Sequence, residues 1–179
     1  MEHEGCQLEG SQKTCFFTKN VSMFGTLTTE EMDQLLTRQL MGRLGCNAFG
    51  RTYVIPISYA YRDGAIYCYT MEGLKLSMLR ENKKVCFQVD DSKDLSNWQS
   101  VICWGEFEEL TSDADRTEAL AVLNARHLPV RTSMKMQINK DWPYGEKGSE
   151  MINGIFFRIN IEDKTGRCET AETSTNYAS

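Results

Sequence analysis

The chain has few of the residues on which several kinds of site depend. Only two of its 179 residues are histidine, His3 and His127, and none of its seven cysteines forms a Cys-x-x-Cys pair. Zinc sites of ordinary spacing need clusters of these ligands, so we expect no metal centre. With His127 as the only internal histidine, a Ser–His–Asp hydrolytic arrangement also has no convincing candidate.

Long apolar runs and an excess of positive charge are missing as well. No stretch approaches the roughly 20 apolar residues of a membrane helix, and the N-terminal region does not show the pattern of a secretory signal. The net charge is −5, whereas broad nucleic-acid binding needs clustered Lys and Arg. Cys68, Cys86 and Cys103 lie in apolar runs, as buried free thiols do. We therefore expect a cytoplasmic protein with neither a membrane nor a nucleic acid as partner.

Strand-like segments outnumber helical ones. Tyr53, Ile55 and Ile57 alternate with outward-facing residues along a strand at 52–61, and Asp63-Gly64 is a hairpin signal. Further strands are predicted at 44–48, 65–70, 85–89, 98–110 and 155–161, and helices at 29–41, 73–82 and 114–126. The fold class is therefore mainly β: an antiparallel split barrel with peripheral helices, because closure removes exposed sheet edges.

The chain length suits one domain. We place this domain at residues 26–168, after a flexible arm at 1–25 and before a disordered tail at 169–179. A capping box from Thr28 to Glu31 predicts the start of the first helix, and Gly42 is expected to mark its end. A polar loop is expected at 90–97 and a long irregular connection at 127–153, where a substrate could bind.

The turn between the strand at 65–70 and the next helix carries the strongest chemical signal. Gly73 permits close approach to the backbone, the free N–H groups at a helix start attract anions, and Lys75 adds a positive charge. Together these groups fit a terminal phosphate. The pattern is not a P-loop, so spacing alone favours an ordinary turn with a solvated lysine.

Two other segments carry weaker signals. Pro56 cannot donate to a strand ladder, which places it at an edge or bulge where neighbouring backbone groups can meet a planar heterocycle. Trp98, Gln99 and Ser100 open a strand and together suit one wall of a ligand cleft. The residues alone favour a simple edge strand for Pro56, and ordinary barrel packing also explains Trp98.

Taken in order, these segments resemble the pyridoxamine 5′-phosphate oxidase-like flavin-binding split-barrel superfamily. Within it, the sequence is most similar to the nitroimidazole-resistance (Nim-type) reductases. The resemblance is carried by residues 42–45, 53–59, 66–67, 73–75, 79–82, 85–87, 98–101 and 165–167.

The resemblance implies a homodimer with flavin at the subunit interface, FMN in the first instance and FAD as an alternative. It assigns the phosphate to Thr70, Met71, Glu72, Gly73, Leu74 and Lys75. It assigns the flavin ring to Ile55, Pro56, Ile57 and Ser58, and a second cofactor-side strand to Trp98, Gln99 and Ser100.

The implied activity is that of a flavin-dependent oxidoreductase, in which the flavin carries the electrons and the protein orients it. A small electron donor and a small acceptor, such as a nitroaromatic compound, would be its reaction partners. Nim-type reductases often carry a histidine where this sequence has Tyr69. The pattern isolates no catalytic acid or base. A non-catalytic flavin carrier or sensor, a haem-handling split barrel and a plain structural domain remain as alternatives.

Overall fold

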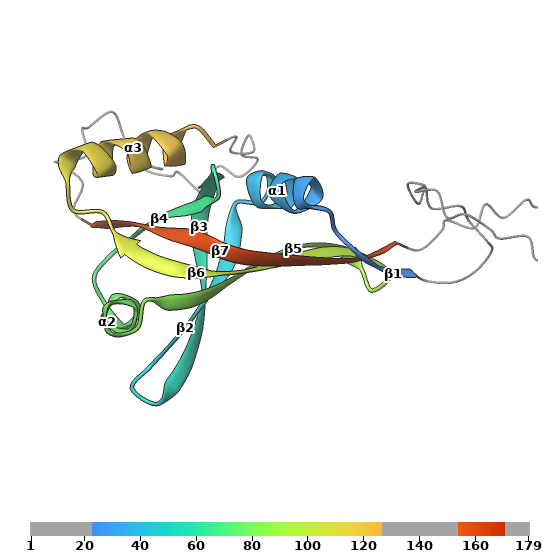
Figure 1. The fold of residues 1–179 in the computed structure, drawn as a ribbon, viewed down its shortest axis with the longest axis horizontal. Helices are drawn as coiled ribbons and strands as arrows, with labels where there is room; N and C mark the ends of the chain where they lie inside the picture. The colour runs from blue at the N-terminus through green and yellow to red at the C-terminus, as the bar shows by residue number, and fades with distance from the viewer. Residues whose placement is uncertain (1–22, 127–153, 171–179) are drawn as a thin grey trace, which may run out of the picture.

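The computed structural model of the protein describes residues 23–126 and 154–170. Seven strands and three helices follow one another along these residues (Figure 1). The strands are β1 (Met23–Thr26), β2 (Met41–Ala48), β3 (Arg51–Arg62), β4 (Ala65–Thr70), β5 (Lys84–Asp94), β6 (Asn97–Glu109) and β7 (Ile155–Thr170). The helices are α1 (Thr29–Arg38), α2 (Leu74–Glu81) and α3 (Asp113–Asn124).

The strands form one antiparallel sheet that closes on itself. Their order is β1-β7-β4-β3-β2-β5-β6, and an additional β6–β7 pairing completes the ring. β3 pairs with β2 from Arg51 to Ser58 but with β4 only from Tyr59 to Arg62. The barrel is thus split along β3, and the predicted mainly-β split barrel with peripheral helices is confirmed.

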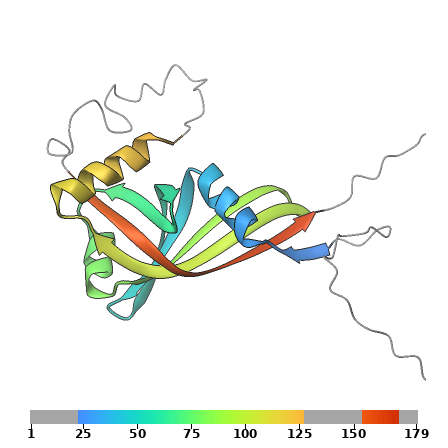
Figure 2. The ribbon, with the colours of Figure 1, turned by 45° about the horizontal axis from the view of Figure 1, so that its top comes forward.

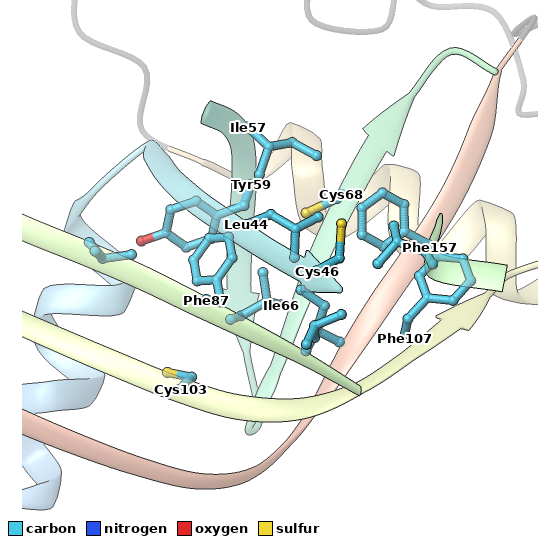
Figure 3. Close-up of a cluster of buried hydrophobic side chains, with 14 of the residues drawn as sticks. Leu44, Cys46, Ile57, Tyr59, Ile66, Cys68, Phe87, Cys103, Phe107 and Phe157 are labelled. Atoms are coloured by element: carbon cyan, nitrogen blue, oxygen red, sulfur yellow. The ribbon is translucent and has the colours of Figure 1, made fainter. Parts of the chain in front are cut away.

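The core fills the inside of this ring (Figure 3). Ile57 and Tyr59 of β3 are buried in it, as the predicted alternation requires. Tyr59 packs edge-on against Phe87 with 4.9 Å between ring centroids, and its hydroxyl donates to the carbonyl of Leu36 at 2.7 Å. The burial of these aromatic rings fixes which face of β3 points inward.

The three helices lie at different places on the barrel (Figures 1 and 2). α1 starts at the predicted Thr28 capping box and buries Met32, Leu35 and Leu36 in the main core. α2 packs against β2 and buries Leu76, Met78 and Leu79. α3 covers a second, smaller cluster that includes Ala60, Tyr67 and Phe156. Within the described residues, no helix is long and apolar enough to cross a membrane.

Three local predictions were wrong: the end of the first helix, the loop at 90–97 and the end of the last strand. α1 ends at Arg38, and Gly42 lies buried inside β2, where a Cβ would stand 2.2 Å from Cζ of Phe87. The expected polar loop at 90–97 is mostly strand, because Asp90 and Asp91 continue the β5–β6 ladder opposite Ser100 and Gln99.

The last strand runs from Ile155 to Thr170, well beyond its predicted end at 161, because it pairs with β4, β6 and β1 in turn. The sheet therefore includes residues 23–25, which were predicted to belong to the flexible arm, and residues 169–170, which were predicted to belong to the tail. The expected connection at 127–153 lies outside the described residues.

Candidate functional site

The N-terminus of α2 is built differently from those of the other two helices. Its N-cap is Gly73, which has no side-chain cap, and its first turn contains no acidic residue. By contrast, α1 and α3 start with Thr28 and Ser112 caps and have acidic first turns. The helical ladder begins with the bond from Ser77 N–H to the Gly73 carbonyl at 3.2 Å, so the preceding N–H groups have no intrahelical acceptor. This end of α2 can therefore receive an anion from outside the chain.

Gly73 and Lys75 leave room and positive charge at that end. A Cβ added to Gly73 would meet no atom within 4 Å. Lys75 is half-buried, and within the described residues it makes no hydrogen bond or ion pair. Burial lowers the pKa of its ammonium group, while the nearby thiols of Cys68 and Cys46 act in the opposite direction. A buried cation without a counter-ion is costly, and a bound phosphate would remove that cost.

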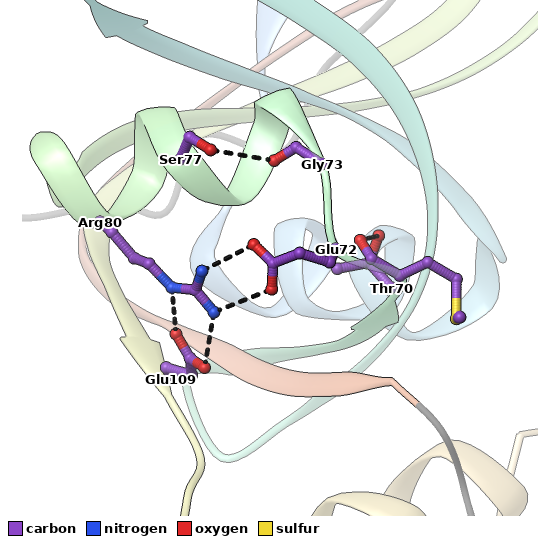
Figure 4. A network of polar contacts seen from close by, with 7 residues as sticks. Thr70, Glu72, Gly73, Ser77, Arg80 and Glu109 are labelled. Atoms are coloured by element: carbon purple, nitrogen blue, oxygen red, sulfur yellow. Dashed lines mark hydrogen bonds and ion pairs between the residues drawn. The ribbon is translucent and has the colours of Figure 1, made fainter.

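The acidic residue of the loop is neutralised by a fork of hydrogen bonds (Figure 4). Arg80 Nη1 and Nη2 donate to the two carboxylate oxygens of Glu72 at 2.7 and 3.2 Å. The same guanidinium donates through Nε and Nη2 to Glu109 at 2.8 and 3.0 Å. Glu72 therefore offers no free negative charge to an incoming anion.

The other members of the predicted phosphate loop surround this end of α2. Thr70 is buried at the end of β4, and its hydroxyl donates to the carbonyl of Met71 at 3.3 Å. Met71 and Leu74 are exposed apolar side chains beside the open space at Gly73.

β3 presents an open edge to the same part of the molecule. Tyr59 N–H donates to the Leu40 carbonyl at 3.2 Å, which directs every second backbone group of β3 toward β2. The alternate groups, at Pro56 and Ser58, therefore point away from β2, along the part of β3 where β4 no longer pairs with it. The predicted position of Pro56 at an edge is confirmed, and its missing N–H faces that open side.

The Lys75 ammonium group lies near two buried thiols. Its charge interacts with Cys46, which is opposite Tyr53 in the β2–β3 ladder, and with Cys68, which is opposite Tyr59 in the β3–β4 ladder. Ile55, Pro56, Ile57 and Ser58 occupy the stretch of β3 between these two points. β4, which leads into the predicted phosphate loop, pairs with β3 only from Tyr59 onward, so the split begins where the predicted ring strand ends.

Arg126, just after α3, adds a cation that the sequence patterns did not single out. Its Nη1 donates to Ser58 Oγ and to the Tyr59 carbonyl, both at 2.7 Å, and its Nε donates to the Leu123 carbonyl at 2.9 Å. Its Nη2 is buried and has no acceptor in the part of the chain that the structure describes. Arg126 fixes Ser58 at the open edge, and only the three-dimensional fold shows this contact, because 68 positions separate the two residues.

Trp98, Gln99 and Ser100 lie far from α2 within one chain. They begin β6, whereas Glu109, which contacts α2 through Arg80, ends it. The eleven residue steps from Trp98 to Glu109 span roughly 36 Å of strand. Figure 1 shows α2 and the β1 end of the sheet at opposite ends of the long axis. One chain does not bring the third predicted segment to the other two.

The three polar or aromatic side chains of this segment have partners of their own. Trp98 Nε1 donates to Glu169 at 2.9 Å. Gln99 accepts from Arg38 at 3.2 Å, and Ser100 Oγ accepts from Gln88 at 3.1 Å. Trp98 and Gln99 line a cavity of about 360 Å³ between α1, the β5–β6 hairpin and the end of β7.

Tyr69, the residue that differs from the Nim-type pattern, is packed beside the loop. Its ring lies 5.1 Å from that of Phe156, and a Cβ on Gly154 would stand 2.4 Å from the Tyr69 ring. Its hydroxyl is 3.7 Å from the sulfur of Met71. Tyr69 thus joins β4, β7 and the predicted phosphate loop.

Comparisons with known proteins agree with the fold. A family model described as pyridoxamine 5′-phosphate oxidase matches residues 28–167. The chain is 33% identical to an FAD-binding protein of Mesorhizobium loti, whose crystal structure it matches with a TM-score of 0.63 over 83% of this chain and 99% of that one.

Two further relatives are more distant. An uncharacterised protein of Rhizobium meliloti is 27% identical over 152 residues, which is 81% of this chain and 95% of the relative. A candidate 5-nitroimidazole antibiotic resistance protein of Bacteroides thetaiotaomicron matches with a TM-score of 0.64 over 87% of this chain and 96% of its own, at 16% identity. At that identity the likeness extends to the fold alone.

Proposed function

Because the chain belongs to the pyridoxamine 5′-phosphate oxidase family, we propose that it binds a flavin and works as a flavin-dependent oxidoreductase. The observation that carries the proposal is the uncapped start of α2, where Lys75 has no counter-ion among residues 23–126 and 154–170 and the space in front of Gly73 is open. The FAD bound by the Mesorhizobium relative favours FAD over the FMN expected from the sequence pattern.

The residues present fit a flavin at the split in the barrel. Lys75 and the free N–H groups of α2 would hold a phosphate, and the open edge of β3 at Pro56 and Ser58 would face the ring. Arg126 would keep Ser58 in place. A bound flavin supplies electron transfer between a small donor and a small acceptor; the protein supplies position and a fixed polar environment.

We also propose that the functional unit is a homodimer with the site between the two copies. An exposed apolar groove of about 670 Å³ crosses the outer face of β2, β3, β5 and β6. It includes Gly45, Cys86, Val54 at 60% exposure and Trp104 at 41% exposure. A contiguous apolar surface of this kind is typical of an interface, and a second copy is the partner that the proposal requires.

A dimer also resolves the separation within one chain. The end of β6 that carries Trp98, Gln99 and Ser100 is too far from α2 to reach the same ligand in one protomer. In a two-fold dimer, this segment of one protomer would complete the site whose α2 belongs to its partner.

For the acceptor, we propose a small molecule such as a nitroaromatic compound, reduced at the face of the ring near Tyr69. Tyr69 is the half-buried side chain that connects β4 to the phosphate loop. The five free cysteines in the described residues are compatible with the reducing cytoplasm.

An absorbance spectrum of the purified protein, with mass analysis of any chromophore released on denaturation, tests this function. We expect twin bands in the near-ultraviolet and the blue, with release of FAD or FMN. A colourless protein that also fails to bind added flavin would refute the proposal. Turnover with reduced nicotinamide and a nitroaromatic acceptor then separates a reductase from a passive flavin carrier.

A further inference from the structure

The cavity of about 360 Å³ beside Trp98 is not used by the phosphate loop or by the ring strand. It lies at the β1 end of the sheet, where α1, the β5–β6 hairpin and the last residues of β7 meet. Its size is at the lower end of the range for ligand pockets, which suits one part of a larger molecule. Its principal lining residues are Arg38, Asp91, Lys93, Trp98, Gln99 and Glu169.

Trp98 gives this cavity an aromatic wall that is held in place. Its indole N–H donates to Glu169 Oε2 at 2.9 Å, and Glu169 is itself buried at 8% exposure. The ring of Phe24 lies 6.3 Å from that of Trp98 at an angle of 55°. An indole fixed in this way is a platform on which a heteroaromatic base can stack.

The charged groups of the cavity balance one another. Arg38 donates to Asp91 at 3.0 Å and to Gln99 at 3.2 Å, so its charge is already paired. Glu169 is engaged by Trp98, and Lys93 makes no hydrogen bond or ion pair within the described residues. A free phosphate or carboxylate would gain little from such a balanced interior. A neutral group with donor edges and hydroxyls is a better match, since the carboxylates and the Gln99 carbonyl are acceptors.

We propose that this cavity binds an adenosine group, namely the adenosine end of FAD. The proposal rests on the proposed flavin function and deepens it. A flavin whose first phosphate is held by Lys75 of one protomer would extend toward Gln99 and Trp98 of the partner subunit. Lys93, a cation at the cavity that no described residue pairs with, would then lie near the second phosphate of FAD. FMN has neither that phosphate nor the base, so the cavity selects FAD.

Equilibrium titration of the flavin-free protein with FAD and with FMN tests the assignment. We expect the wild type to bind FAD at least about tenfold more tightly than FMN. Trp98→Ala should weaken FAD binding by roughly 5- to 150-fold, the usual effect of losing one base–aromatic stack, and change FMN binding by less than about twofold. Trp98→Phe should retain most of the preference. Leu95→Ala, at the exposed tip of the same hairpin, serves as the matched control.

A second arm uses AMP as the probe, detected by saturation-transfer NMR, and separates FAD from a dissociable nucleotide as the source of adenosine. If FAD and FMN bind equally but AMP binds and is lost in Trp98→Ala, the cavity binds adenosine and the assignment to FAD is overturned. If neither the FAD preference nor AMP binding depends on Trp98, the whole inference is overturned. If the protein binds no flavin, the proposed function fails, and the AMP arm alone decides whether the cavity takes adenosine.

Discussion

Replacing Lys75 by alanine removes the half-buried cation at the start of α2 and should weaken binding of any flavin that carries a phosphate. A hydrogen bond to a charged group contributes about 1.5–3 kcal/mol. The expected increase in the Kd for FMN is therefore about 10- to 150-fold. Folding should not suffer, because Lys75 gives up no hydrogen bond or ion pair within the described residues.

Riboflavin, which lacks the phosphate, is the internal control for this variant. We expect fluorescence titration to show a much weaker affinity for FMN and an unchanged affinity for riboflavin. Lys83→Ala, an exposed lysine beyond the other end of α2, should leave both affinities unchanged. Equal losses for FMN and riboflavin, or no loss at all, would refute the role that we assign to Lys75.

Four other changes test separate parts of the account. Gly73→Ala should leave the thermal midpoint unchanged but weaken flavin binding, because the new methyl group meets no protein atom and occupies ligand space; a large loss of stability would contradict this. Arg80→Gln should weaken FMN binding about two- to fivefold by freeing the charge of Glu72, and adding Glu72→Gln should restore it; no rescue would exclude charge as the cause. Val54→Asp should convert a dimer to a monomer in light scattering and lower flavin occupancy, whereas a persistent dimer would place the interface elsewhere. Arg80 lowers the pKa of Glu109, so the stability that Glu109 contributes is present above about pH 4.5 and is lost as the pH falls through its lowered pKa. Melting curves of wild type and Glu109→Gln should therefore differ at pH 7, and the difference should begin to shrink as the pH falls below about 4.5.

The sequence predicted the architecture wherever local signals and packing agreed. The Thr28 capping box, the Asp63-Gly64 turn and the alternation along β3 are local patterns, and each was confirmed. Gly42 misled because a glycine after a helical pattern resembles a helix end. Its real role is a close approach to Phe87, which lies on another strand.

The lengths of β5 and β7 could not be predicted from local hydrophobicity. Asp90 and Asp91 read as loop residues, but the ladder with β6 continues through them, and Arg43 and Arg38 pair with their carboxylates. β7 extends through polar residues because three different strands pair with it. Pairing of this kind is a property of the closed sheet and leaves no local signal in the sequence.

For the site, the sequence assigned the phosphate to the loop at 70–75 and the flavin ring to the strand at 55–58, and both assignments stay predictions. The structure shows that β4 pairs with β3 only beyond this strand, from Tyr59 onward. The sequence did not indicate that Arg126 holds Ser58, or that Arg80 neutralises Glu72 and Glu109 at once. It also did not indicate that Trp98, Gln99 and Ser100 lie at the other end of the molecule. These relations depend on distances between segments, and assignment of the third segment to the same ligand requires a second chain.

Native mass spectrometry of the purified protein tests whether a flavin is held between two copies of this chain. We predict a complex of two chains with two flavins, which loses flavin when the dimer dissociates. A monomer that retains one flavin would contradict the split site, and a protein that binds no flavin in any oligomeric state would contradict the proposed function itself.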